Sequence, residues 1–298
     1  MRSDSVAGVP SLRIQVVLYK SDPACIRRLV VSLAHSVSLA RRAGLIGDAR
    51  LLLGDSAPEA PTAVGDLSTE DLPVEVVVFD RNLGHGGGQN ALAAGRAEDL
   101  LLIINPDCVA DPQLVSRLVA RMDRDDRIGI VEARQLPVEH PKAYDTVTGQ
   151  TDWTSMACAL LRSDAVAQVG LFDADSFFMH GDDVDLSWRM RLGGWDLVHE
   201  PTARVFHDKR IDVYGYIEAS ATERVHGPLG SLVLAYKYDR DDVLNALADQ
   251  LREGNEEHQE ALRLFEAKRD RGELPAERLD PDRAVATFEG GTFARHRF

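Results

Sequence analysis

The sequence predicts an α/β fold in which a mostly parallel central sheet is flanked by helices. Short apolar runs rich in β-branched residues alternate along the chain with longer segments of helical propensity, as in parallel sheets. Each apolar run also ends in a polar cluster, which marks the end of a buried strand. The 298 residues have a hydrophobic fraction of 44%, enough for a sizeable core, so a disordered chain is excluded.

The predicted elements alternate along the chain. Strands are expected at residues 12–19, 50–53, 74–79 and 100–104. Helices are expected at residues 24–43, 88–99 and 111–122. The first helix follows the start signal Ser21-Asp22-Pro23, and the last begins at Asp111-Pro112. Between residues 152 and 206, short strands and one helix are expected to finish the sheet with antiparallel strands.

Composition divides the chain into three parts. Residues 1–10 lack an apolar segment of the kind found in secretory signals, and we expect a flexible leader there. Residues 11–215 carry the alternating strands and helices and form the predicted main domain. Residues 216–298 are charged and poor in strands, which predicts a mainly helical extension on a solvated flank.

Charge and cysteine content exclude several classes of protein. Lys and Arg total 34 against 48 Asp and Glu, and this acidic balance repels nucleic-acid phosphates, so no nucleic-acid partner is expected. The longest apolar runs are far shorter than the roughly 20 residues that span a bilayer, so no transmembrane segment is expected. Three widely spaced cysteines without a CxxC pair predict neither a disulfide framework nor a zinc site, and they favour a cytoplasmic location.

A glycine-rich segment at residues 82–90 lies between a predicted strand and a predicted helix. Its bare backbone amides and the positive end of the helix favour a phosphate, which indicates a nucleotide ligand. Gly84 and Gly86 match the dinucleotide fingerprint G-x-G-x-x-G, but its third position is Gln89. A tight turn that lets the helix pack on the sheet explains the same glycines equally well.

Two separate positions predict a divalent metal ion. Asn105-Pro106-Asp107 follows the most hydrophobic strand, so the Asp107 carboxylate stands at a strand end, where Mg²⁺ or Mn²⁺ can bridge two phosphates. His207 follows a later predicted strand and completes the ligand set if that strand runs back beside the one that ends at Asp107. A simple Pro-Asp turn and an ordinary histidine at a strand end are the alternatives.

The densest group of acidic residues lies at Asp182, Asp183 and Asp185, flanked by aromatic residues. Carboxylates this close raise one another's pKa, and a shielded carboxylate of raised pKa suits a general base at neutral pH. The alternative is structural: Asp182 or Asp183 caps a helix, and Asp185 pairs with Arg189 one turn later.

The order of these motifs over residues 12–209 resembles the family 2 inverting glycosyltransferases with a GT-A fold, especially bacterial rhamnosyltransferase-like members. The matching motifs are Leu18-Tyr19-Lys20, Gly54-Asp55-Ser56, residues 82–90, Asn105-Pro106-Asp107, residues 156–162, Asp182-Asp183-Val184-Asp185 and His207. Many relatives carry an acid at the position of Asn105 and a glutamate at that of Asp182. These two departures leave the donor's identity more open than the reaction.

The resemblance implies a role for each motif residue. Asp183 is the implied catalytic base, and Asp107 and His207 hold Mn²⁺ or Mg²⁺ on a diphosphate. Six residues are expected to bind the nucleotide sugar: Tyr19, Asp55, Asn82, Gly84, Asn90 and Asp182. Of these, Tyr19 and Asp55 line the nucleobase and ribose site.

The expected activity is inverting transfer of a sugar from a nucleotide-diphosphate donor to an acceptor hydroxyl. The resemblance favours dTDP-rhamnose as donor, with UDP-sugars second, and the acceptor is a glycan, a lipid-linked glycan or a small molecule. A sugar-nucleotide pyrophosphorylase and a non-catalytic sugar-nucleotide-binding module are the alternatives. The first is disfavoured because Lys20-Ser21-Asp22-Pro23, not a glycine-rich loop, follows the first strand. A homodimer, a peripheral membrane contact and a role of the extension over the acceptor stay open.

Overall fold

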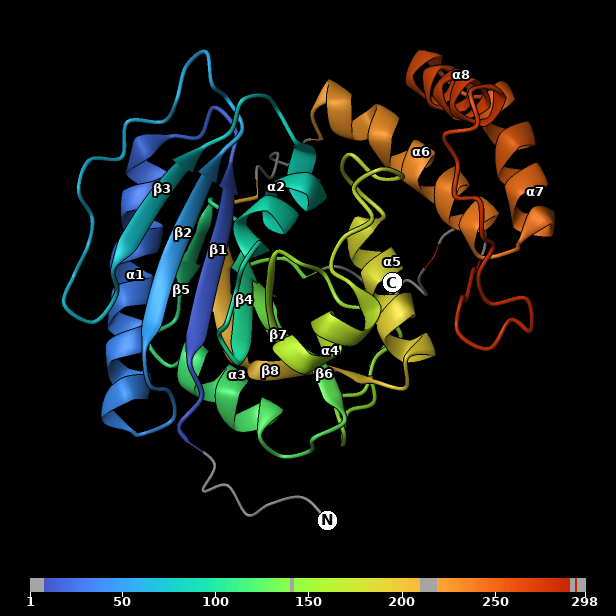
Figure 1. Ribbon diagram of the computed structural model, residues 1–298. Coiled ribbons are helices and arrows are strands. Elements are labelled where there is room, and N and C mark those ends of the chain that lie inside the picture. The colour runs from blue at the N-terminus through green and yellow to red at the C-terminus, as the bar shows by residue number, and fades with distance from the viewer. Residues whose placement is uncertain (1–7, 140–141, 210–218, 290–292, 294–298) are drawn as a thin grey trace.

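The computed structural model describes residues 8–139, 142–209, 219–289 and 293. One eight-stranded sheet forms its centre, in the order β3-β2-β1-β4-β7-β6-β8-β5 (Figure 1). The strands are β1 Leu12–Leu18, β2 Ala49–Asp55, β3 Val74–Val78, β4 Leu100–Ile104, β5 Cys108–Ala110, β6 Ile128–Leu136, β7 Cys158–Arg162 and β8 Asp196–His207. The helices are α1 Pro23–Arg42, α2 Gly84–Ala93, α3 Leu114–Met122, α4 Ser163–Val169, α5 Asp182–Leu192, α6 Ala221–Lys237, α7 Asp241–Arg252 and α8 Glu256–Asp270.

The first half of the sheet is parallel, as the sequence predicts. β3, β2, β1 and β4 pair in parallel, and helices cover both of their faces. Leu51 and Leu53 of β2 join an apolar cluster that includes α1 and α3. Leu52, between them, points to the other face and packs with Leu92 of α2, because successive side chains of a strand alternate in direction.

The second half of the sheet mixes directions and places a predicted site. β7 runs antiparallel to β4 and β6, β8 runs parallel to β6, and β5 runs antiparallel to β8. In the last pairing, Cys108 lies opposite His207. The predicted neighbourhood was different, since β8 does not pair with β4, the strand that precedes Asp107. It pairs with β5, which follows Asp107, and this pairing brings Asp107 beside His207.

Three helix starts differ from the sequence predictions, and one of them, α3, begins at Leu114 rather than at residue 111. The helix expected at 88–99 begins at Gly84 and ends at Ala93, so the glycines form its first turns. Gly84 has φ 70°, and a Cβ there would meet the Phe178 carbonyl oxygen at 2.3 Å, so close packing rather than helix propensity places this start. Helix α5 is preceded by Gly181 at φ 82°, and no side chain caps it, so capping by Asp182 or Asp183 is wrong.

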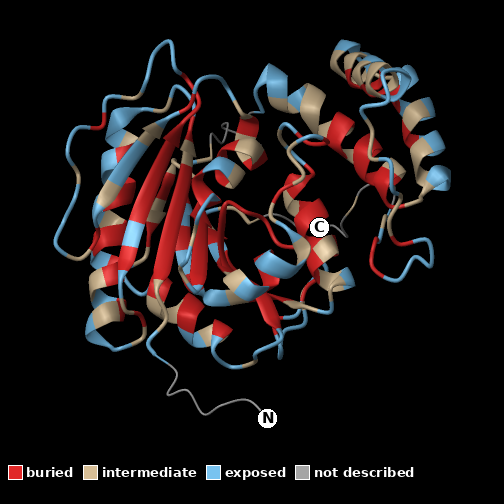
Figure 2. Ribbon diagram, viewed as in Figure 1, coloured by how far each residue is buried: buried red, intermediate tan, exposed pale blue. Residues whose placement is uncertain are grey.

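The predicted helical extension contains α6, α7 and α8, which lie together on the side of the molecule away from β3 (Figure 1). Their inward faces are buried, and sparse apolar residues such as Leu251 and Phe265 join Val184 and Trp188 of α5 in one apolar cluster (Figure 2). The extension therefore packs directly on α5. The predicted boundary between residues 215 and 216 and residues 1–7 of the predicted leader lie outside the described residues.

Two further features bear on the sequence predictions. Cys25, Cys108 and Cys158 are all free thiols. None of the described helices combines the length and the apolar character needed to cross a membrane.

Candidate active site

A cleft of about 520 Å³ opens beyond the carboxyl ends of β4 and β8, beside the start of α5. It brings together five of the residues that the sequence singles out: Asn105, Asp107, Asp182, Asp183 and His207. His85, Ser155, His180 and Glu223 also line it. Tyr19, Asp55, Asn82, Gly84 and Asn90 are not part of its lining.

Asp183 is the second residue of α5 and is partly exposed in the cleft. Its Oδ1 accepts a hydrogen bond from the Val184 backbone N–H at 2.9 Å. Burial and the neighbouring charge of Asp182 raise the pKa of Asp183 to about 7. A carboxyl group with this pKa accepts a proton effectively near neutral pH.

Asp182 lies behind Asp183 and is only 4% exposed. Its Oδ2 lies 2.7 Å from Nδ1 of His85, in the first turn of α2. Burial alone raises the pKa of the Asp182 carboxyl, but the charge and hydrogen bond of His85 outweigh burial and lower it. The two adjacent carboxyl groups therefore differ, since Asp182 holds a negative charge while Asp183 titrates near neutrality.

Asp107 and His207 face each other across the β5–β8 pairing, with Asp107 Oδ1 3.2 Å from His207 Nε2. The other ring nitrogen, Nδ1, lies 2.8 Å from Oε1 of buried Gln135. The Gln135 amide nitrogen donates to Ser155 Oγ, so its carbonyl oxygen faces the ring and Nδ1 carries the proton. Nε2 then presents a lone pair to a carboxylate oxygen, an arrangement that suits a cation between the two.

Cys108 is a third potential ligand, because its Sγ and the ligand atoms of Asp107 and His207 all lie within 4.8 Å of one another. Burial raises the pKa of the Cys108 thiol well above its usual range, and Sγ donates weakly to the Ala157 carbonyl oxygen. The thiol therefore stays protonated. Carboxylate and imidazole remain as donors, a set that fits Mn²⁺ or Mg²⁺ better than a thiophilic metal.

The family of this chain can be read from its sequence. Residues 16–179, more than half of the chain, match the model of Glycosyl transferase family 2. The chain belongs to glycosyl transferase family 2.

Two curated proteins of Mycobacterium tuberculosis are similar to this family 2 chain. N-acetylglucosaminyl-diphospho-decaprenol L-rhamnosyltransferase is 27% identical over 182 residues, covering 46% of this chain and 59% of that protein. Pre-mycofactocin glycosyltransferase is 25% identical over 225 residues, covering 69% of this chain and 44% of that protein. The chain thus spans about half the length of the curated relatives it matches.

Solved structures show the GT-A fold for this family 2 chain. GalNAc-T7 with UDP, GalNAc and Mn²⁺ matches with a TM-score of 0.61 at 14% identity, covering 89% of this chain and 55% of that one. The Pyrobaculum calidifontis mannosyltransferase PcManGT, in complex with GDP-Man and Mn²⁺, matches with a TM-score of 0.56 at 15% identity, covering 87% and 69%. The predicted fold class is confirmed.

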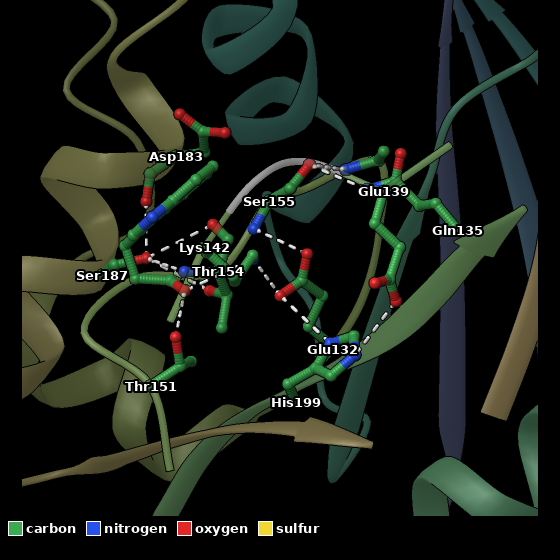
Figure 3. A network of polar contacts seen from close by, with 12 residues as sticks. Glu132, Gln135, Glu139, Lys142, Thr151, Thr154, Ser155, Asp183, Ser187 and His199 are labelled. Carbon is green, nitrogen blue, oxygen red and sulfur yellow. Dashed lines mark hydrogen bonds and ion pairs between the residues drawn. The ribbon is translucent and has the colours of Figure 1, made fainter. Parts of the chain in front are cut away.

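Beneath the cleft of this family 2 chain, a buried polar network supports the loop that carries Ser155 (Figure 3). Glu132 of β6 contacts the Lys142 ammonium group, and its other carboxylate oxygen accepts from the Ser155 backbone N–H at 3.2 Å. On the opposite side, Thr154 N–H donates to Ser187 Oγ of α5 at 3.0 Å. The loop is thus held between the helix of Asp183 and the Gln135 side chain that orients His207.

Sequence reasoning missed Glu132, Gln135, Lys142 and His85 as parts of the site. A signal existed for two of them, since Glu132 directly follows the apolar start of β6, Gln135 lies near the end of the same strand, and both are buried. Buried polar side chains need partners, so such interruptions indicate a polar network. Neither the partners nor their distance from the cleft could be derived from the spacing.

The residues predicted to bind the nucleotide sugar outside the cleft lining have other visible contacts. Asp55 is 1% exposed, and its carboxylate accepts from the backbone N–H groups of Ala57 at 2.9 Å and Thr62 at 2.6 Å. Asn82 Oδ1 accepts from the Gly84 backbone N–H at 3.0 Å. Tyr19 lies half-exposed just after β1. The Asn90 side chain forms hydrogen bonds with both the backbone N–H and the carbonyl oxygen of Phe172.

These contacts show that Asp55 and Asn82 shape the turns that follow them and that Asn90 of α2 holds the backbone at Phe172. Direct contact of these residues, Tyr19 or Gly84 with a nucleotide sugar stays a prediction.

Gln135→Leu is expected to weaken Mn²⁺ binding by about 10-fold to 100-fold, because the His207 ring loses the acceptor that fixes its tautomer and orientation. Gln135→Glu keeps an acceptor for Nδ1–H and is expected to weaken Mn²⁺ binding less than Gln135→Leu does. Calorimetric titration with Mn²⁺ measures both, alongside thermal unfolding to confirm the fold. Equal affinity in wild type and Gln135→Leu would contradict this role.

Proposed function

We propose that the protein is an inverting glycosyltransferase that transfers a sugar from a nucleotide-diphosphate donor to an acceptor hydroxyl. The observation that carries this proposal is the cleft itself. It joins Asp183, whose pKa lies at about 7, with the facing pair Asp107 and His207. A base and an ion site in one cleft are what a single displacement at a sugar-diphosphate bond requires.

In the proposed reaction, the Asp183 carboxylate takes the proton of the acceptor hydroxyl. The acceptor oxygen forms a bond to the anomeric carbon, and the bond from that carbon to the diphosphate oxygen breaks with its electron pair leaving on the diphosphate. One displacement inverts the anomeric configuration. Asp107 and His207 would hold a divalent ion, which supplies positive charge that stabilises the leaving diphosphate.

The transferase test measures nucleoside diphosphate release from dTDP-rhamnose and from UDP-sugars, with Mn²⁺ and a panel of hydroxyl acceptors. Transfer should invert the anomeric configuration, which proton NMR of the product reads directly. Retained configuration would contradict the single displacement. Donor binding without hydrolysis or transfer would favour the non-catalytic binding module. Formation of a nucleotide sugar from a nucleoside triphosphate and a sugar phosphate would favour the pyrophosphorylase.

The donor preference follows from Asn105, which lines the cleft where many relatives carry an acid. An amide in place of a carboxylate weakens the hold on ribose hydroxyls, and a site that does not bind the 2′-hydroxyl discriminates little against a deoxyribose. We therefore expect dTDP to bind at least as tightly as UDP. The similarity to an L-rhamnosyltransferase supports rhamnose as the transferred sugar.

Calorimetric titration of dTDP, UDP and GDP at fixed Mn²⁺ tests the donor preference. A clear preference for UDP or GDP would remove the rhamnosyl donor. It would leave the transferase assignment intact, because Asp183 and Asp107 act on parts of the donor common to all three.

A further inference from the structure

His85 lies in the first turn of α2 and lines the cleft together with Asp182 and Asp183. No role of its own for this histidine follows from the sequence motifs. Its place is fixed by packing, because the start of α2 presses against the chain before α5, where the His85 backbone N–H donates to the Phe178 carbonyl oxygen at 3.2 Å. The side chain is 26% exposed, so the ring is accessible from the cleft.

The contacts of His85 leave one polar atom for a ligand. Nδ1 lies 2.7 Å from Asp182 Oδ2, and an ionised carboxylate only accepts, so Nδ1 carries a proton and donates. The ring also packs edge-to-face on Phe172, at 5.2 Å between centroids, which fixes its plane. Among the described residues, none forms a hydrogen bond with Nε2.

The surroundings of His85 favour its cationic form. Burial alone lowers the pKa of His85, but the charge and hydrogen bond of Asp182, with a further contribution from Asp183, outweigh it and raise the pKa. Of the other titratable groups near this pair, His180 has a pKa that burial lowers, which favours its neutral form, and α2 carries no ionisable side chain besides His85. A cationic His85 presents Nε2–H as a donor, next to the positive end of the α2 dipole.

We propose that His85 is a further donor-binding residue, whose Nε2–H donates to a phosphate oxygen of the nucleotide diphosphate while Asp182 holds the ring in place. This inference rests on the proposed function, which supplies the diphosphate. In this arrangement buried Asp182 acts through the His85 imidazole, so Asp182 does not need to contact the sugar itself.

Calorimetric titration of dTDP and of UDP at fixed Mn²⁺ tests the inference in wild type and His85→Gln. The substitution removes the charge and is expected to weaken both affinities by about 10-fold to 100-fold, as the loss of a charge-assisted hydrogen bond does. His35→Gln, which changes an exposed histidine on α1, is the matched control and should bind as wild type does. Asp182→Asn keeps the side-chain size and should bind less tightly than wild type.

The outcomes separate this inference from the proposed function. If wild type binds neither dTDP nor UDP, the proposed function fails. If wild type binds and a folded His85→Gln variant binds within about twofold of it, the role of His85 fails by itself. Wild-type affinity in Asp182→Asn would contradict the part given to Asp182. Thermal unfolding monitors the fold, and His85→Asn replaces the glutamine variant if the latter does not fold.

Discussion

Asp183→Asn is expected to lower kcat by about 100-fold or more while the fold and nucleotide binding persist. The asparagine carbonyl can still accept the Val184 N–H hydrogen bond that Asp183 Oδ1 accepts, so the start of α5 keeps its local structure. What disappears is the group that takes the acceptor's proton. Steady-state kinetics with donor titration separates kcat from KM, and Asp175→Asn, at an exposed acid in the loop before α5, serves as control.

The pH dependence gives the same prediction an independent readout. Burial and the charge of Asp182 raise the pKa of Asp183 to about 7, and only the ionised carboxylate accepts a proton. The wild-type kcat is therefore expected to fall as pH drops below about 7 and to level off above it. The asparagine variant should lack this step. Near wild-type turnover in Asp183→Asn would exclude Asp183 as the base.

Asp107→Ala is expected to abolish the metal dependence of nucleotide binding and to lower the Mn²⁺-dependent affinity for dTDP by at least about 10-fold. The ion would lose its anionic protein ligand. Removing a ligand lowers metal affinity at least as much as removing a group that only orients a ligand. His207→Ala should act in the same direction with a smaller loss, because imidazole is neutral when it binds an ion. Titration of dTDP with Mn²⁺ and with EDTA measures both variants.

The metal prediction has a defined alternative. If nucleotide affinity is the same with and without metal, and both alanine variants bind as wild type does, the ion site is excluded. A diphosphate held by the backbone amides of residues 84–88, at the start of α2, then becomes preferable. Unchanged thermal unfolding in both variants is the control for fold, since His207 is 7% exposed and bonds to Gln135.

The sequence by itself determined the alternating α/β pattern, the helical extension and the family. These are local properties, because apolar runs of strand length and helical segments show in the order of residues along the chain. The Asp185–Arg189 pair was predictable for the same reason, since residues four apart on a helix are neighbours, and it forms at 2.8 Å. Asp107 and Asp183 were found through motifs at strand and helix ends.

Only the tertiary structure decided which of these residues meet. Asp107 faces His207 because β5 pairs with β8, and strand pairing between residues 100 apart in the chain leaves no trace in spacing. The start of α2 was misplaced because glycine has low helix propensity, whereas packing against Phe178 requires the absence of a side chain at Gly84. The same packing places His85 beside Asp182. The difference in pKa between the carboxyl groups of Asp182 and Asp183 therefore arises from contacts that only the folded chain makes.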